Sequence, residues 1–176
     1  MKTISIILVL IAIATGSYYY WAHRGTSYAE INSFEECSTQ GNPIIESYPR
    51  QCRTKDGRTF KEGIGNELEK INLIRVATPR PNQTIPKPVI IKGEARGTWF
   101  FEASFPIKII DKNGNQLGTG VAQAQGEWMT EDFVPFETVI QFTAPTTDTG
   151  SLILEKDNPS GLPQYDDQLV IPIKFK

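Results

Sequence analysis

The chain has 176 residues with 18 Lys and Arg, 20 Asp and Glu and 39% apolar residues, which suits one domain with a small attachment. Without residues 1–24, which contain Lys2 and Arg24 and no acid, 16 bases face 20 acids. This mildly acidic balance argues against binding to nucleic acid or anionic lipid, because both need a basic face. Aromatic residues make up 10% and charged residues 22%, so the composition also argues against disorder.

The N-terminal segment has the layout of a membrane helix. Residues 4–21 carry no charge and end in the aromatic run Tyr18-Tyr19-Tyr20-Trp21, with Lys2 before them and Arg24 after them. As a helix they would extend about 27 Å, close to the thickness of the hydrocarbon layer. Tyr and Trp favour the membrane interface. We therefore expect an uncleaved transmembrane anchor at residues 1–24 that enters the cytoplasmic membrane through residues 4–21.

The cysteines indicate the side of the membrane better than the flanking charges, which give only a marginal preference. Cys37 and Cys52 are expected to form a disulfide, and disulfides persist on the oxidising side. We predict a single pass with the N-terminus inside and the globular part extracytoplasmic. A cleaved signal sequence, with Ala14 and Gly16 just before the cut, is the alternative.

A two-cysteine module is predicted at residues 34–62, after a polar stalk at 25–33 and before a linker at 63–70. A disulfide that closes a loop of about fifteen residues contributes roughly 3 kcal/mol. Asp56-Gly57 is a signal for a tight hairpin turn with arms at 53–55 and 58–60. The apolar residues expected to cluster around the bridge are Phe34, Ile44, Ile45, Tyr48 and Phe60.

Other roles for the two cysteines are weaker. A zinc site needs four ligands, and the one histidine, His23, lies at the membrane edge. A redox pair would normally be separated by two residues. The run around Tyr48-Pro49 and Cys52 loosely resembles one stretch of a Kazal-type inhibitor, although the other cysteines of that domain are absent. The sequence therefore favours a disulfide-stapled spacer or accessory module, with no metal and no cofactor.

The rest of the chain has the pattern of an all-β domain. Short runs rich in Ile, Val, Phe and Thr alternate with turn residues, which predicts an immunoglobulin-like antiparallel β-sandwich of about seven strands. Within these runs, apolar residues recur at every second position, so one face of each strand is expected in the core. The predicted strands are 71–77, 88–94, 99–111, 116–125, 133–143, 151–156 and 168–175.

This domain also contains a proline within a predicted strand, a predicted hairpin turn and an acidic loop. Pro106 inside the third strand indicates a bulge or an edge position. Asn113-Gly114 predicts a two-residue hairpin turn, and the surrounding Asp and Asn residues fail the calcium-loop pattern. The loop with Asp157, Asp166 and Asp167 could bind a cation weakly, although solvated carboxylates are the commoner case.

The segment from Gly93 to Phe142, with the flanking strands that begin near Ile71 and Asp167, resembles the immunoglobulin-like domain of bacterial spore germination proteins. The resemblance covers about residues 71–176. It implies an all-β, non-catalytic module for extracytoplasmic binding or assembly, and no spore-related role follows from it. The resemblance rests on Gly93, Ala95, Arg96, Gly97, Trp99, Phe101, Glu102, the turn from Asp111 to Gly114, Trp128, and Pro135-Phe136.

Physical reasoning assigns most of this motif to the fold. Gly93 and Gly97 would allow sharp turns on either side of Arg96, and Trp99 would anchor the core. We expect Arg96 to pair with Glu102. Trp128 follows a loop-like stretch and is the candidate for ligand contact.

The sequence contains no Gly-x-Ser-x-Gly elbow, no phosphate-binding glycine loop and no histidine pair, so we predict that the protein is not an enzyme. We predict a membrane-anchored module that binds or assembles with another envelope protein. One alternative is a binder of cell-wall glycan or a small ligand through Trp128 and the acidic loop. A less favoured alternative is an exported protease inhibitor built on the cysteine module.

Overall fold

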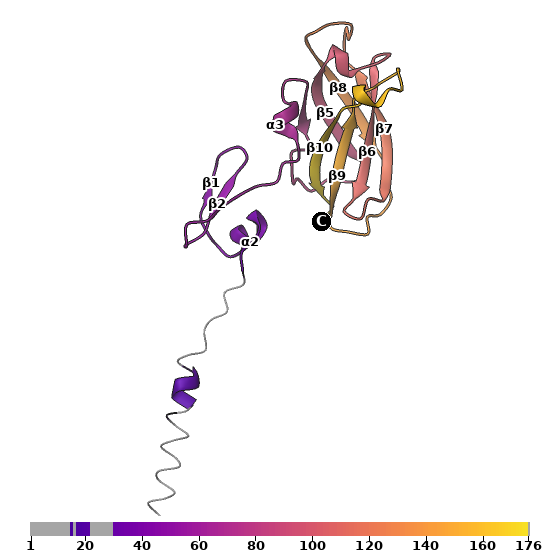
Figure 1. Cartoon of the computed structure of the whole chain (residues 1–176). Coiled ribbons are helices and arrows are strands. Elements are labelled where there is room, and N and C mark those ends of the chain that lie inside the picture. The colour runs from indigo at the N-terminus through magenta and orange to yellow at the C-terminus, as the bar shows by residue number, and fades with distance from the viewer. Residues whose placement is uncertain (1–14, 16, 22–29, 176) are drawn as a thin grey trace, which may run out of the picture.

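The computed structural model describes Thr15 and residues 17–21 and 30–175 (Figure 1). Thr15 and residues 17–21 are helical, and the side chains of Tyr18 to Trp21 are exposed. Most of the predicted anchor at 1–24 and most of the predicted stalk at 25–33 lie outside the described residues. Within the described part, no helix is long and apolar enough to span a bilayer.

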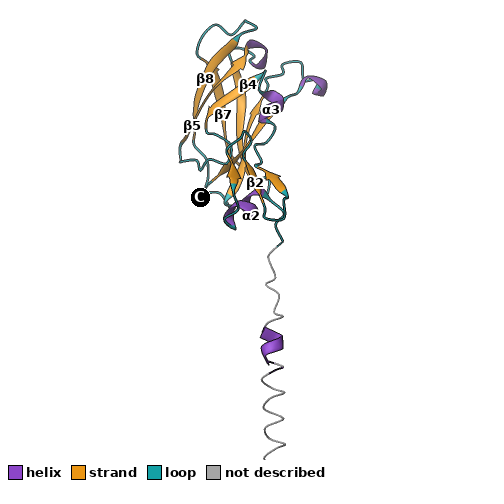
Figure 2. Cartoon of the chain, turned by 90° about the vertical axis from the view of Figure 1, so that its left-hand side faces the viewer, coloured by secondary structure: helices purple, strands orange, loops and turns teal. Residues whose placement is uncertain are grey.

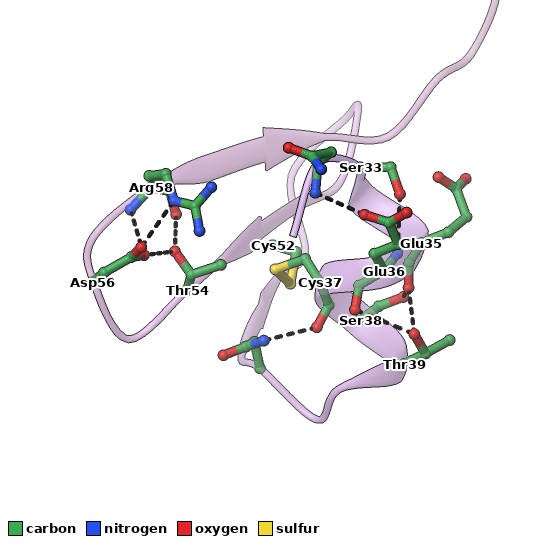
Figure 3. The surroundings of a disulfide bond; sticks show 12 residues. Ser33, Glu35, Glu36, Cys37, Ser38, Thr39, Cys52, Thr54, Asp56 and Arg58 are labelled. Atoms are coloured by element: carbon green, nitrogen blue, oxygen red, sulfur yellow. Dashed lines mark hydrogen bonds and ion pairs between the residues drawn. A yellow bond between two sulfur atoms is a disulfide. The ribbon is translucent and has the colours of Figure 1, made fainter. Parts of the chain in front are cut away.

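The cysteine module consists of one short helix and a three-stranded sheet. The helix α2 (Phe34–Thr39) begins after Ser33, whose hydroxyl accepts a hydrogen bond from the Glu36 amide at 3.0 Å (Figure 3). The antiparallel sheet has the order β1-β2-β3. The hairpin that Asp56-Gly57 predicts is present, but its connection, residues 54–58, is longer than the predicted tight turn. The strands are β1 (Ile44–Ile45), β2 (Gln51–Arg53) and β3 (Thr59–Lys61).

The predicted disulfide is present and joins α2 to β2. Cys37 and Cys52 are fully buried, and Ile31, Phe34 and Phe60 pack around them. The wider cluster predicted from the sequence was wrong in three members. These three lie in or just after β1, a two-residue strand at the edge of the sheet. Their exposed fractions are 38% for Ile44, 49% for Ile45 and 50% for Tyr48.

Seven antiparallel strands form the larger domain, close to the ranges expected from the alternation. The sheet order is β10-β9-β6-β7-β8-β5-β4. A short helix, α3 (Glu67–Lys70), lies beside β10, and the 3-10 turn η2 (Pro163–Tyr165) precedes that strand (Figure 1). The strands are β4 (Ile74–Thr78), β5 (Val89–Arg96), β6 (Ser104–Asp111), β7 (Gln116–Ala124), β8 (Phe133–Ile140), β9 (Thr149–Glu155) and β10 (Gln168–Lys174).

The sheet curls until its two ends almost meet (Figure 2). β7 and β8 share only two residue pairs, which link one half of the sheet to the other. At the open side, Thr84 forms a parallel bridge with Lys174, and the Ile85 amide donates to the Lys174 carbonyl at 2.9 Å. The result is an immunoglobulin-like, nearly closed sheet. Its core contains the largest buried side chains, Trp99, Phe105 and Phe136.

The third predicted strand starts later than expected. Gly97–Trp99 form a 3-10 turn, η1, and the backbone angles φ of Glu102 and Ala103 are +48° and +60°, so the extended strand begins at Ser104. The predicted alternation is therefore shifted here. Phe100 is buried, whereas Phe101, predicted to face the core, is 40% exposed.

Pro106 takes the edge position, one of its two predicted positions, whereas the following hairpin differs from the prediction. β9 pairs with β6 only from Ile107 onward, so Pro106 lies just beyond the end of that pairing. Because β9 does not pair with Pro106, the N–H group that proline lacks costs no hydrogen bond between these two strands. The bulge falls at Ile109/Ile110 instead. The connection to β7 has four residues rather than two, because the buried Asp111 carboxylate accepts hydrogen bonds from the Asn113 and Asn115 amides, both at 2.9 Å.

Candidate functional site

The two glycines of the motif allow backbone segments to approach closely. A Cβ atom on Gly93 would lie 2.2 Å from the Arg75 carbonyl oxygen, and one on Gly97 would lie 2.0 Å from the Thr130 carbonyl oxygen. Neither site has room for a side chain. Gly114 has φ +86°, which its turn requires. Ala95 is fully buried and Phe136 is 2% exposed, so these positions serve the packing of the sandwich.

Arg96 does not form the predicted ion pair with Glu102. Its guanidinium donates to the Asn72 and Glu131 carbonyl oxygens at 3.1 and 2.9 Å, and it lies 4.1 Å from the centroid of the Phe133 ring. The left-handed backbone at Glu102 belongs to the turn before β6. Arg96 therefore ties the segments around Asn72 and Glu131 to the end of β5.

Trp128 is only partly exposed, because it packs against the core of the sandwich. Trp99, the other tryptophan of the motif, is 1% exposed. A shallow depression lies at this end of the domain, and its exposed apolar member is Met129, with 74% of its surface accessible. The depression is lined by Gly97, Thr98, Phe100, Trp128, Met129, Thr130 and Glu131.

Two hollows larger than this depression lie on another surface, the outer face of β10, β9 and β6, which we call the sheet face. The first has a cavity volume of about 610 Å³ and lies toward the acidic loop, lined in part by Asn66, Lys70 and Asp167. The second, of about 520 Å³, lies at the opposite end beside Gly63, Gly65 and the floor of the sheet. Side chains of the sheet face are half-buried and mostly apolar or paired; they are Pro106, Lys108, Ile110, Ser151, Ile153, Glu155, Val170 and Pro172.

Residues 63–70, predicted as a linker, form one wall of the sheet face. The Asn66 side chain accepts a hydrogen bond from the Val170 amide at 2.7 Å and donates to the Gln168 carbonyl at 2.9 Å. β10 is the last strand of the sheet, and these bonds pair part of the edge that faces away from β9. Gly65 has φ +70°, and a Cβ there would meet the Val170 carbonyl oxygen at 1.8 Å. Sequence reasoning missed this contact, since Gly65-Asn66 reads only as a turn.

Two buried acids join the cysteine module to the sandwich. Glu67, whose side chain is 6% exposed, binds Arg80 at 2.6 Å and accepts a hydrogen bond from the Tyr48 hydroxyl. Burial and the neighbouring Glu67 carboxylate raise the pKa of Tyr48 above its ordinary value. The second acid, Glu62, belongs to the module and makes a separate contact with the sandwich.

The Glu62 carboxylate binds the Arg50 guanidinium through two hydrogen bonds of 2.8 and 2.7 Å. Asn82 of the sandwich donates to the same carboxylate at 3.1 Å and to the Gly63 carbonyl at 2.8 Å. Hydrogen bonding from Arg50 lowers the pKa of Glu62 below its ordinary value, against the opposing effect of burial. The module is therefore held to the sandwich by polar contacts at two points.

The acidic loop is paired rather than open. Asp167 lies 2.6 Å from the Lys70 ammonium group, and the Asn158 amide donates to Asp166 at 2.7 Å. Among the described residues, no group of three or more acids, histidines or cysteines is placed to hold a metal ion. Asp157 lies in the same hollow, on the rim of the sheet face.

One protein-family model matches the part of the chain that contains the motif residues. The model for the immunoglobulin-like domain of bacterial spore germination matches residues 73–161. The chain belongs to this family. No curated protein and no solved structure matches the chain. Membership of this family suggests that the chain is a non-catalytic binding or assembly module. Most of the motif residues described above stabilise its fold.

Proposed function

We propose that this protein is a membrane-anchored, extracytoplasmic and non-catalytic module that binds or assembles with another protein of the bacterial envelope. Membership of the spore germination immunoglobulin-like domain family supports a binding or assembly role. The disulfide between Cys37 and Cys52 supports an oxidising compartment. The uncharged run at residues 4–21 supports an anchor in the cytoplasmic membrane.

The observation that carries the proposal is the sheet face. It offers a floor of half-buried apolar residues, a wall at 63–70 and a hollow at each end, an arrangement suited to a protein segment. The ion pair between Lys108 and Glu155, 2.7 Å apart, lies in the middle of this face. Such an ion pair would contribute to the orientation and specificity of a bound partner more than to its affinity.

The titratable groups of the described residues support a non-catalytic role. Shifted pKa values belong to groups in ion pairs, in turns or, for Tyr48, in a hydrogen bond with Glu67. Each of these groups already has its hydrogen-bond partners within the fold. Catalytic acids and bases are usually found with a shifted pKa in a cleft, free to meet a substrate.

Site-specific photocrosslinking in native membranes tests the proposal. A photoreactive amino acid at Ser151, on the sheet face, is expected to capture a defined envelope protein from cells that express the full chain. The matched control is the same residue at Val139, which is 56% exposed on the outer face of β8. Equal capture at both positions, or capture at neither, would contradict a binding role for the sheet face. A chain recovered in the soluble fraction would contradict the anchor.

A cell-wall glycan or small ligand is the alternative occupant, and the depression beside Trp128 favours it. The ring of the partly exposed Trp128 is suited to stacking against an apolar sugar face, and the exposed Met129 would add an apolar contact beside it. This alternative predicts that the full chain is retained by isolated wall polymer and that Trp128→Ala abolishes the retention. Retention that survives this substitution would exclude the depression as the binding site.

A further inference from the structure

The charges of the cysteine module are divided between the two faces of its sheet. Cys52 lies opposite Phe60, and α2 covers this inner face through the disulfide. Two arginines lie on the inner side and are paired. Arg50 binds Glu62 and lies 5.4 Å from the Phe34 ring. Arg58 lies 5.6 Å from the Phe60 ring and binds Asp56 at 2.8 Å, a pair that Figure 3 shows.

The other three bases of the module are unpaired. Arg53 and Lys61 alternate with Cys52 and Phe60, so they point away from α2, and Lys55 lies in the hairpin turn. All three are exposed, and their side chains make no hydrogen bond or ion pair with any described residue, although the backbone of Arg53 and Lys61 is paired within the sheet. Ile45, opposite Gln51, adds an apolar side chain that is 49% exposed. We call Ile45, Arg53, Lys55 and Lys61 the basic face.

No acid neutralises the basic face within the module sheet. Its strands contain no Asp or Glu, and Asp56 in the turn is held by Arg58. Glu46, which follows β1, lies outside the strands; the pKa of Arg50 is raised mainly by its hydrogen bonds with Glu62 and to a smaller extent by Glu46. The net charge of the exported chain is negative, yet this one surface is positive. A negative total therefore does not exclude a local contact with anions.

The chain between this module and the predicted anchor is short. Ile31 is fixed in the module, because it packs beside Cys37 and its carbonyl accepts a hydrogen bond from Arg58 at 2.9 Å. Nine Cα steps from Trp21 to Glu30 span at most about 32 Å, even when fully extended. Trp21 belongs at the membrane interface if residues 4–21 cross the bilayer. The module then remains within reach of the lipid headgroups.

We propose that the basic face docks on anionic lipid headgroups of the membrane to which the chain is anchored. This inference rests on the proposed anchor. Arg53, Lys55 and Lys61 would contact phosphate groups, and Ile45 would enter the interface between headgroups and acyl chains. Each basic residue near an anionic surface favours the docked state by roughly fivefold. Docking would orient the sandwich relative to the membrane, since Glu62 and Glu67 hold the module to it.

The test compares the full chain in nanodiscs of phosphatidylcholine with the chain in nanodiscs that also contain phosphatidylglycerol. Amide hydrogen exchange in the 54–58 turn is expected to slow severalfold in the anionic discs, and high salt should reverse the effect. The triple substitution Arg53→Gln, Lys55→Gln, Lys61→Gln should abolish the difference. The matched control, Lys112→Gln with Lys156→Gln, removes charge from the sandwich and should preserve the difference.

The outcomes separate the lipid contact from the anchor. Copurification with the discs reports the anchor independently of exchange. A chain that does not copurify would overturn both the anchor and the docking. A chain that copurifies but shows equal exchange in the two discs would overturn the docking alone. Protection in phosphatidylcholine discs upon addition of soluble polyphosphate, without protection by phosphatidylglycerol, would also overturn the assignment to lipid.

Discussion

The Asn66 side chain forms hydrogen bonds with the backbone of β10, accepting from the Val170 amide at 2.7 Å across 104 residues of sequence. Its own amide donates to the Gln168 carbonyl, so one side chain replaces part of a strand neighbour. An unpaired strand edge is a site of unwanted association. Asn66 thus protects one edge of the sandwich and places residues 63–70 as a wall of the sheet face.

Replacing Asn66 should test this wall directly. We expect Asn66→Ala to lower the free energy of unfolding by about 1–3 kcal/mol, because the Val170 amide loses its partner. Chemical denaturation of the full chain in detergent measures the change. Asn113→Ala is the control, since the Asn113 side chain is exposed and makes no side-chain hydrogen bond in the described structure. An equal effect of both substitutions would contradict a special role for Asn66.

A methyl group at Gly97 should be poorly tolerated. Gly97→Ala places a Cβ about 2 Å from two backbone carbonyl oxygens, those of Trp128 and Thr130. We expect a loss of about 2 kcal/mol or more in the free energy of unfolding. Gly126→Ala, where a Cβ meets nothing within 4 Å, should change it by less than about 1 kcal/mol. Matching stabilities of the two variants would contradict the packing described for the motif.

Loss of the disulfide should affect the module more than the sandwich. The variant Cys37→Ala with Cys52→Ala removes the link between α2 and β2, which we expect to contribute about 2–5 kcal/mol to the module. Hydrogen exchange should rise in residues 34–62 and stay low in β5, β6 and β9. Collapse of protection throughout both parts would show that the sandwich depends on the module.

Acid should weaken the junction at Glu62. Because the pKa of Glu62 is lowered in the fold, its stabilising contribution is present above the unfolded pKa near 4.5 and is lost as pH falls through the folded pKa. Denaturation of the wild type should therefore become easier below about pH 4.5. Glu62→Gln should flatten that part of the pH profile, and Glu46→Gln should not. A wild-type profile that matches Glu62→Gln would contradict the role of this carboxylate.

The sequence alone was sufficient for the fold class and for most strands. Strict alternation in β10, where Leu169, Ile171 and Ile173 are buried, follows from local pattern because one face of a strand contacts the core. The disulfide and the family membership could likewise be predicted from residues whose order and spacing are read directly from the sequence. Departures occurred where local geometry breaks the alternation, as at Glu102 and Ala103 before β6.

Only the tertiary structure decided which residues meet across long separations. Arg96 contacts Asn72 and Glu131 rather than the nearby Glu102, because the ends of strands distant in sequence converge there. The same holds for Asn66 on β10. The distribution of charge on the cysteine module is a third feature that the sequence alone does not determine. Composition records only the sum of its acids and bases, whereas the pairing of strands places the paired arginines on one face and the unpaired bases on the other.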